Sequence, residues 1–225
     1  MRIAGRWHRA PRANLYRMRP VSVLTIAALA LWLGCCGCRS RLNAPSSDFD
    51  YYILSLSWSP EFCYGHSNSV ECSQHRGFVV HGLWPQFRGR RGPEYCSHAP
   101  GPSTLPLDAS IMPDSGLARH EWEAHGACSG LPPAAYFALV KRAFESIRIP
   151  RPLVSPDRPL RASPGEIIRS FERANPGFSG ASIQLNCRGA YLQSVNICLT
   201  KNLRPAGCSV PHGCREPVVR IAAVR

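Results

Sequence analysis

Several features that define large protein classes are missing from this 225-residue sequence. The longest apolar run, residues 21–33, has 13 residues, whereas a membrane-spanning helix needs about 20. The sequence has no internal repeat and no low-complexity segment, which indicates one domain rather than a repeat array. Beyond residue 38 it has no Cys-x-x-Cys pair, and this absence disfavours a cysteine-based zinc site.

Acidic residues are absent before Asp48. The segment instead carries arginines and the apolar run at 21–33, the charge pattern of an export signal. We expect residues 1–38 to be a signal peptide, with Met1 or Met18 as its start, and residues 39–47 to be a polar linker. The sequence Leu-Gly-Cys at 33–35 is a poor lipoprotein processing pattern, so lipid anchoring stays open beside a free periplasmic or extracellular protein.

The net charge of +13 overstates the basic character of the exported part. Eight of the 27 basic residues and none of the 14 acidic ones precede Asp48, which leaves residues 48–225 with a charge of +5. That excess is compatible with a nucleic-acid partner, but a solvated basic surface explains it more simply. Only Lys141 and Lys201 are lysines, a bias that suggests a GC-rich bacterial genome.

The cysteines become an even set once the signal is removed. Eleven are present, and Cys35, Cys36 and Cys38 fall within the signal. Eight remain, which in an exported chain predicts four disulfides among roughly a hundred possible pairings. The eight are Cys63, Cys72, Cys96, Cys128, Cys187, Cys198, Cys208 and Cys214.

Residue patterns over 48–225 predict a single α+β domain with a central, mostly antiparallel sheet packed with several helices. Expected strands cover residues 51–58, 78–80, 182–187 and 190–200, the last with Tyr191, Gln193, Val195, Ile197 and Leu199 on one side. Expected helices cover residues 117–125, 132–147 and 164–174, the last opened by the capping box Ser163–Glu166. Residues 86–113 are rich in Gly, Pro, Arg and Ser and predict a long surface loop.

Two stretches, residues 78–85 and 120–128, hold the candidate catalytic residues. The first places His81 at the expected end of a strand. On a helix, Glu121 and His125 are four residues apart, so they can reach the same bound group, with His120 at its border. Imidazoles titrate near neutral pH, and two that face one pocket can act as acid and base.

A zinc hydrolase is the first alternative, because His120, Glu121 and His125 suggest the metalloprotease helix. That motif needs histidines four residues apart, whereas these two are five apart and about 140° around the helix. The geometry argues against a metal site.

The two stretches resemble the active-site segments of the ribonuclease T2 family, hydrophobic-x-x-His-Gly-Leu-Trp-Pro and His-Glu-Trp-x-x-His-Gly-x-Cys. The family resemblance also covers the Leu-x-Trp-x-Pro-x-x-Cys pattern that ends at Cys63. It implies a secreted, monomeric endoribonuclease that needs no metal ion or cofactor and cleaves single-stranded RNA through a 2′,3′-cyclic phosphate.

The resemblance also implies the residue roles. His125 is the expected base and His81 the expected acid, although the reverse assignment stays open. Glu121 orients or polarises the phosphate region, His120 binds the phosphate, and Trp84 is a candidate platform for base stacking. The implied disulfides are Cys63–Cys72, Cys96–Cys128, Cys187–Cys214 and Cys198–Cys208.

The chain departs from the family pattern at Ala124, where a lysine is usual, and at Ala127, where a threonine is usual. Arg119 or Arg88 could supply the missing cation. A second alternative is therefore a secreted RNA-binding or interaction protein that has lost catalysis. We expect Trp58 and Trp122 to be core residues, and the four remaining histidines after residue 48 to be structural or surface residues, namely His66, His75, His98 and His212.

Overall fold

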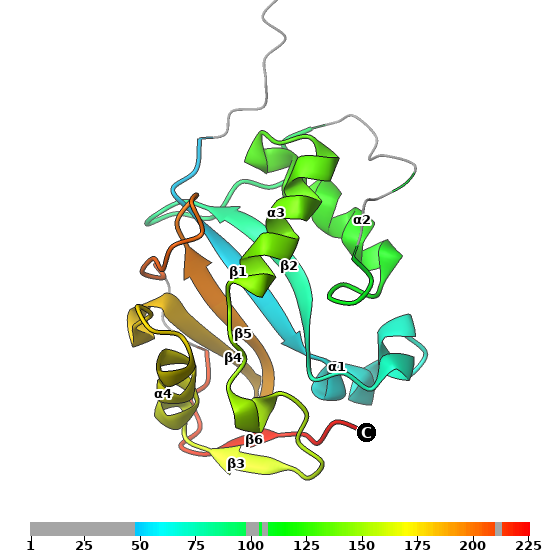
Figure 1. Ribbon diagram of the computed structural model, residues 1–225, viewed down its shortest axis with the longest axis vertical. Coiled ribbons are helices and arrows are strands. Elements are labelled where there is room, and N and C mark those ends of the chain that lie inside the picture. Colours follow the sequence, from blue (N-terminus) through cyan, green and yellow to red (C-terminus); the bar gives the residue numbers. More distant parts are fainter. Residues whose placement is uncertain (1–47, 98–103, 105–107, 210–212) are drawn as a thin grey trace, which may run out of the picture. The chain divides into compact units, whose positions relative to one another are not determined.

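The computed structural model describes residues 48–97, 104, 108–209 and 213–225. The expected signal peptide and linker, His98 and His212 lie outside these residues. Figure 1 shows a central sheet with helices around it. The strands are β1 (Tyr51–Trp58), β2 (Phe78–Gln86), β3 (Leu160–Ala162), β4 (Ile183–Arg188), β5 (Tyr191–Leu199) and β6 (Val219–Ile221).

The helices follow the expected α+β pattern. The α-helices are α1 (Ser59–Gly65), α2 (Ser115–Ala124), α3 (Pro133–Glu145) and α4 (Pro164–Ala174). Short 3₁₀ turns are η2 (Val70–Gln74), η3 (Gly126–Ser129), η4 (Arg151–Leu153) and η5 (Gly180–Ser182). In the part described, none of the helices has the length and apolar character needed to cross a bilayer.

The sheet is mostly antiparallel, as predicted. Its strand order is β2-β1-β5-β6-β3, with β4 paired to the other side of β5. The exception is the pairing of β5 with β6, which is parallel and places Tyr191 opposite Arg220. The sheet is therefore mixed, and β2 is an edge strand.

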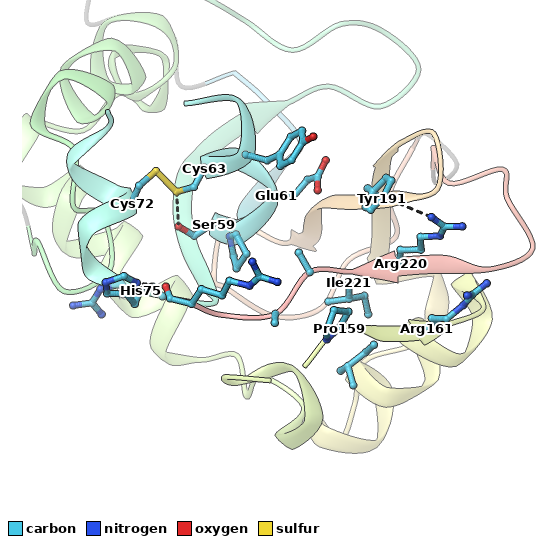
Figure 2. A pocket seen from close by; sticks show the side chains of 17 residues that line it. Ser59, Glu61, Cys63, Cys72, His75, Pro159, Arg161, Tyr191, Arg220 and Ile221 are labelled. Carbon is cyan, nitrogen blue, oxygen red and sulfur yellow. Dashed lines mark hydrogen bonds between the residues drawn. A yellow bond between two sulfur atoms is a disulfide. The ribbon is translucent and has the colours of Figure 1, made fainter. Parts of the chain in front are cut away.

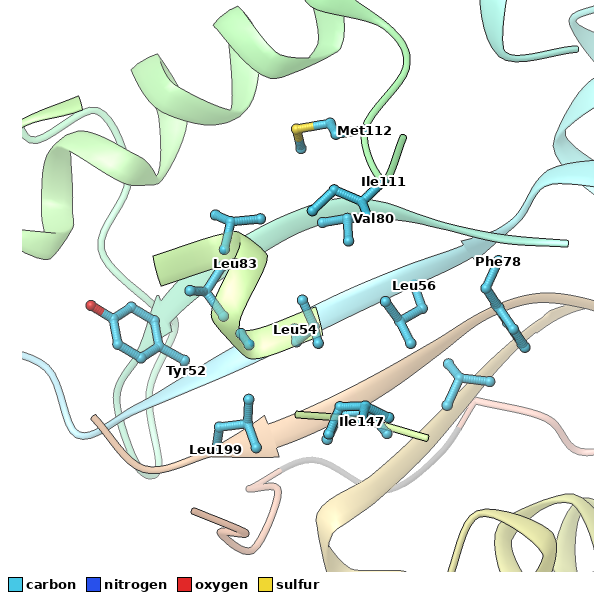
Figure 3. Packing of buried hydrophobic residues seen from close by; sticks show 14 of the residues in the cluster. Tyr52, Leu54, Leu56, Phe78, Val80, Leu83, Ile111, Met112, Ile147 and Leu199 are labelled. Carbon is cyan, nitrogen blue, oxygen red and sulfur yellow. The ribbon is translucent and has the colours of Figure 1, made fainter. Parts of the chain in front are cut away.

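One face of the sheet carries the main hydrophobic core. Leu54 and Leu56 of β1 lie beside Leu83 and Val80 of β2 in this layer (Figure 3). Helices α3 and α4 cover it with side chains that include Phe137 and Phe171. Because successive strand residues alternate between faces, Ser55 and Ser57 point away from this core. The opposite face is thus left to polar side chains near the middle of β1.

A β-bulge in β2 corrects the predicted end of that strand. We expected the strand to stop at Val80, but it continues to Gln86. Ser55 pairs with Gly82 and Leu56 with Val80, which leaves His81 as the extra residue. The bulge keeps the strand paired beyond the histidine, and the edge position accommodates Pro85, which lacks an N–H to donate.

A second bulge corrects the expected alternation in β5. Asn186 pairs with Ser194 and Cys187 with Leu192, so Gln193 is the extra residue. Leu192 joins the buried side chains with Val195, while Tyr191 and Gln193 are exposed. The prediction that Tyr191 and Gln193 share a side with Val195 was therefore wrong. One inserted residue reverses the faces of all side chains that precede it in the strand.

The helix ends also refine the expectations. The Asp114 side chain accepts hydrogen bonds from the N–H groups of Gly116 and Leu117, so α2 begins two residues earlier than predicted. It ends at Ala124, and His125 has a non-helical backbone (φ −128°, ψ −44°). The capping box of α4 is confirmed, since the Ser163 and Glu166 side chains each bond to the backbone of the other.

The four disulfides of the structure are the pairs that the family resemblance implies, Cys63–Cys72, Cys96–Cys128, Cys187–Cys214 and Cys198–Cys208. Cys96–Cys128 ties the segment after β2 to η3, the turn that follows α2. Elements α1, β3, β6 and the 3₁₀ turns η2, η3, η4 and η5 were not predicted, and all of them are short.

Asn175 offers a test of how α4 is fixed. Its side chain accepts a hydrogen bond from Arg148 N–H (2.7 Å) and donates to the carbonyls of Arg148 (2.8 Å) and Phe171 (2.9 Å). Asn175→Ala removes all three hydrogen bonds and leaves the part-buried N–H and carbonyl of Arg148 without these partners, so we expect a loss of about 2–3 kcal/mol in the free energy of unfolding. Urea denaturation with the disulfides intact measures it. Asn202→Ala, at an exposed turn, is the control, and equal stability of the two variants would contradict the prediction.

Candidate active site

His81 projects from the bulge in β2 between two oxygen atoms. Its Nδ1 lies 3.2 Å from Ser57 Oγ, and its Nε2 lies 3.2 Å from Glu121 Oε1. The side chain is 39% exposed, so the ring remains open to solvent. An imidazole with protons on both nitrogens can donate to both oxygens, which makes this geometry suitable for a proton donor.

Glu121 is the buried centre of the site. The residue is 1% exposed, and its second oxygen, Oε2, accepts a 2.6 Å hydrogen bond from Trp84 Nε1. A Cβ atom at Gly82 would lie 2.2 Å from Glu121 Oε2 and 2.3 Å from Trp84 Nε1. Any other residue at position 82 would place a side-chain atom in the space of the hydrogen bond between Trp84 and Glu121, so this position requires glycine.

His125 follows the last residue of α2, and its N–H donates to the Glu121 carbonyl (3.0 Å). Its Nδ1 is buried and has no hydrogen-bond partner among the described residues, so Nε2 is the nitrogen that can exchange a proton with a bound group. Burial lowers the pKa of His125 below its ordinary value of 6.5, and the Glu121 and Glu94 charges oppose that shift. His125 is thus neutral near pH 7, as a base must be.

Trp84 lies next to both histidines. Its ring centroid is 5.6 Å from that of His81 and 5.4 Å from that of His125. It is half-buried, and its N–H is used by Glu121. Trp84 therefore positions the site, and its role as a stacking platform stays a prediction. Trp58 and Trp122 are buried, as predicted for core residues.

His120 is exposed on α2, one position before Glu121. Its positive charge is among those that lower the pKa of His125, as is that of His81. His120 therefore lies close enough to affect His125 electrostatically, and its contact with the phosphate stays a prediction. His66 is an exposed residue stacked on Phe62 (4.3 Å), and His75 is an exposed residue bonded to the backbone of Arg225.

The Arg88 side chain contacts Gly207 and Tyr51 and not the residues of the site. Its guanidinium donates to the Gly207 carbonyl (3.3 Å) and lies 5.3 Å from the Tyr51 ring centroid. Ala124 is 2% exposed, and its carbonyl accepts a 2.8 Å hydrogen bond from Tyr95 N–H. The position at which the family usually has a lysine is thus closed over by the segment that follows β2.

A cavity of about 260 Å³ adjoins His81 and Trp84 on the polar face of the sheet. Ser55 and Ser57 of β1 line it, together with residues of α1, β4 and β5. The contact of Ser57 with His81 was not predicted, although the alternation of Ser57 with Leu56 and Trp58 places it on the side away from the core. Arg188 was not predicted either, because its place in the cavity depends on the pairing of β4 with β5.

The arrangement places a buried carboxylate, a solvent-open imidazole and a neutral imidazole around one indole ring. Such a set can accept a proton at His125 and donate one at His81 within a single reaction. Among the described residues, no cluster of three or more His, Cys, Asp or Glu side chains is arranged to hold a metal ion.

The model of the ribonuclease T2 family matches residues 49–208. The chain belongs to that family. A protein named ribonuclease from Aeromonas hydrophila is 33% identical over 191 residues, a match that covers 82% of this chain and 86% of the relative. The family model spans both histidine-containing segments, so membership rests on most of residues 48–225.

Solved structures of the family have the same fold. An RNase-related protein from Calystegia sepium superposes with a TM-score of 0.64 at 19% identity, covering 79% of this chain and 98% of its own. A mutant of ribonuclease MC1, a protein from bitter gourd seeds, was solved with 5′-UMP. It superposes with a TM-score of 0.58 at 22% identity, covering 76% of this chain and 97% of its own. At these identities the likeness concerns the fold alone.

The lowered pKa of His125 can be tested by NMR titration of its ring. We expect a midpoint below 6.5, and a further decrease in Glu121→Gln, because the Glu121 charge opposes the shift. Glu123→Gln, on the exposed side of α2, is the matched control and should leave the midpoint unchanged.

The same shift has a consequence for stability. Folded His125 binds a proton less readily than unfolded His125, so its contribution is complete above pH 6.5 and declines as the pH falls below that value. A midpoint at or above 6.5 would contradict the burial argument, whatever the stability profile.

Proposed function

We propose that the protein is an endoribonuclease that cleaves single-stranded RNA without a metal ion, through a 2′,3′-cyclic phosphate, to 3′-phosphate ends. The observation that carries the proposal is that the rings of His81 and His125 both lie next to Trp84, while only the His81 ring contacts the Glu121 carboxylate. Two histidines in different environments can hold different protonation states, as an acid and a base require.

In the first step His125 accepts the proton of the ribose 2′-OH through Nε2. The 2′-oxygen forms a bond to phosphorus while the bond from phosphorus to the 5′-oxygen breaks. His81 gives its proton to the departing 5′-oxygen, which takes the place of Ser57 or Glu121 as the acceptor at His81. The products are a 2′,3′-cyclic phosphate and a free 5′-hydroxyl.

In the second step water opens the cyclic phosphate, with the two roles exchanged. His81, now neutral, accepts a proton from the water molecule whose oxygen bonds to phosphorus. His125, now protonated, gives its proton to the 2′-oxygen as that bond breaks. The enzyme returns to its first protonation state, and the product is a 3′-phosphate.

Charge that develops on the phosphate needs positive partners, since electrostatic stabilisation is often the largest catalytic contribution. His120 at the border of the site supplies one such partner, and the histidine that is protonated at each step supplies another. Glu121 orients His81 and Trp84 and lies too deep to act as the acid itself.

The disulfides also bear on the compartment in which the protein acts. Four disulfides suit an oxidising compartment, so we propose that residues 1–38 direct export to the periplasm or beyond and that residues 48–225 act there as one domain. We propose a monomer, because the histidines, Glu121 and Trp84 all come from one chain.

The alternative is a binding protein on the same scaffold, which Ala124 favours. To separate the two, single-stranded RNA is incubated in excess EDTA with the disulfide-bonded protein. We expect fragments with 2′,3′-cyclic phosphate ends, and a decrease in kcat of about 10²–10⁴ in His125→Ala, because the general base is lost. Glu123→Ala is the control, exposed at a neighbouring position. RNA binding without cleavage by the unmodified protein would favour the binding protein.

The assignment of acid and base can be tested with a substrate whose leaving group needs no proton. Uridine 3′-(4-nitrophenyl phosphate) releases nitrophenolate, so His81→Ala should recover most of the activity that it loses on RNA. His125→Ala should stay impaired on both substrates, since the 2′-OH still needs a base. Recovery in His125→Ala in place of His81→Ala would reverse the two roles.

A further inference from the structure

The polar face of the sheet continues away from His81 as a line of connected side chains. Ser57, which bonds to His81, is the Cα partner of Ser194 on β5. Asn186 of β4 donates a 3.0 Å hydrogen bond to Ser194 Oγ. These side chains line the 260 Å³ cavity beside His81, and Arg188 closes it at the end of β4.

Arg188 also begins a row that crosses four strands. Arg188 of β4 is the Cα partner of Tyr191, Tyr191 of Arg220, and Arg220 of Arg161. Paired strands lie about 4.8 Å apart, so the row extends over roughly 14 Å. Each member lies next to a residue packed in the core, as Arg220 lies between Val219 and Ile221. Alternation therefore turns all four side chains toward the polar face. We call these four residues the arginine row.

The row leads into a second cavity, of about 690 Å³, between α1, β3, β6 and the chain after β6. Figure 2 shows Tyr191, Arg220 and Arg161 along its wall. Arg220 Nη1 donates to Tyr191 Oη (3.2 Å), and its guanidinium carbon lies 5.6 Å from the tyrosine ring centroid. Arg76 and Arg225 add two more guanidinium groups to the lining.

Glu61 joins the two cavities and is the acidic residue of both linings. It is 7% exposed, and its Oε1 accepts a 2.6 Å hydrogen bond from Arg188 Nη2. The pair neutralises the acid while leaving the Arg188 side chain 56% exposed. The larger cavity therefore keeps an excess of positive charge next to exposed tyrosine rings, since Tyr64 is 87% and Tyr191 41% exposed.

This chemistry fits a single-stranded nucleic acid. Guanidinium groups bind phosphates in a bidentate manner, and aromatic rings stack with bases of any identity. Along β5, Tyr191 lies three residues from Ser194, about 10 Å at the rise of a strand. The next nucleotides of a chain that leaves the histidines are within that reach.

We propose that the arginine row and the 690 Å³ cavity bind the RNA on the 3′ side of the cleaved bond. The direction follows from His81, because the cavity that leads to the row adjoins this histidine, and His81 protonates the departing 5′-oxygen. The inference thus rests on the proposed function. The site increases affinity for long RNA and leaves the cleavage of a dinucleotide unchanged.

The test uses DNA oligonucleotides with one ribonucleotide, so that cleavage occurs at one bond. One oligonucleotide is extended by several deoxynucleotides on the 3′ side of that bond and the other on the 5′ side. The full-length protein is compared with the double variant Arg161→Ala/Arg220→Ala. The control is Arg142→Ala/Arg173→Ala, which removes the same charge from exposed positions on α3 and α4, the helices of the other sheet face.

Salt dependence is measured as the slope of the logarithm of the binding constant against the logarithm of the salt concentration. The loss of two phosphate contacts should make this slope less steep by about 1.4, about 0.7 for each contact. Between about 50 and 200 mM salt, the unmodified protein should therefore lose about sevenfold more affinity for the 3′-extended oligonucleotide than the double variant loses. At low salt, kcat/KM for that oligonucleotide should fall in the double variant and be retained in the control.

An equal effect on the 5′-extended oligonucleotide, or an equal loss in the control variant, would overturn the proposal. Fluorescence anisotropy measures binding of an oligonucleotide that carries a 2′-O-methyl group at the cleavable position. Because this group blocks cleavage, binding at the proposed site is measured separately from catalysis. If no protein cleaves RNA but the double variant still binds the 3′-extended chain more weakly, the proposed function fails and the site stands. If cleavage proceeds and 3′ extension has no effect, the site fails alone.

Discussion

The buried carboxylate of Glu121 is the constraint on which the site depends. A carboxylate removed from water is costly unless its oxygens are occupied by donors. Here one oxygen lies against His81 and the other accepts from Trp84, both from β2, while the residue itself belongs to α2. The pairing fixes the helix to the edge strand and fixes the orientation of both rings. Gly82 permits it, because any side chain there would occupy the space of the hydrogen bond. The contacts that fix α2 to β2 thus also set the geometry of the site.

Bulges determine which side chains reach the polar face. Val80 and Leu83 are three residues apart, yet both face the core, because the extra residue His81 is accommodated between them. Without the bulge one of the two would face the opposite side, and the core and the site could not both form. The bulge at Gln193 has the same effect on β5, where it separates buried Val195 from exposed Tyr191. The site and the arginine row both exist because the pairing is irregular.

The dependence on β-bulges explains which features could be predicted from the sequence and which could not. β1 and the capping box of α4 come from local patterns, and local patterns are visible along a chain. The contact of Glu121 with His81 joins α2 to β2, so the spacing of residues 120–125 could not predict it. The extent of β2 and the faces of Tyr191 and Gln193 depend on bulges, which are properties of two strands together. The Ser57 contact to His81 and the cavities depend in the same way on tertiary pairing. The family resemblance supplied the disulfide pairs, which spacing alone left open.

The distribution of positive charge links the catalytic site to the rest of the sheet. Near the histidines the position of the usual lysine is a buried alanine under the backbone of Tyr95, and Arg88 is held by Gly207. Arginines gather instead at the other end of the polar face, beyond the Glu61–Arg188 pair. A cation at the phosphate raises kcat, whereas cations at remote nucleotides raise affinity for the whole chain. If His81 and His125 act as proposed, a protein with this distribution gains most on long RNA, where binding energy from remote contacts holds the reacting phosphate against the two histidines.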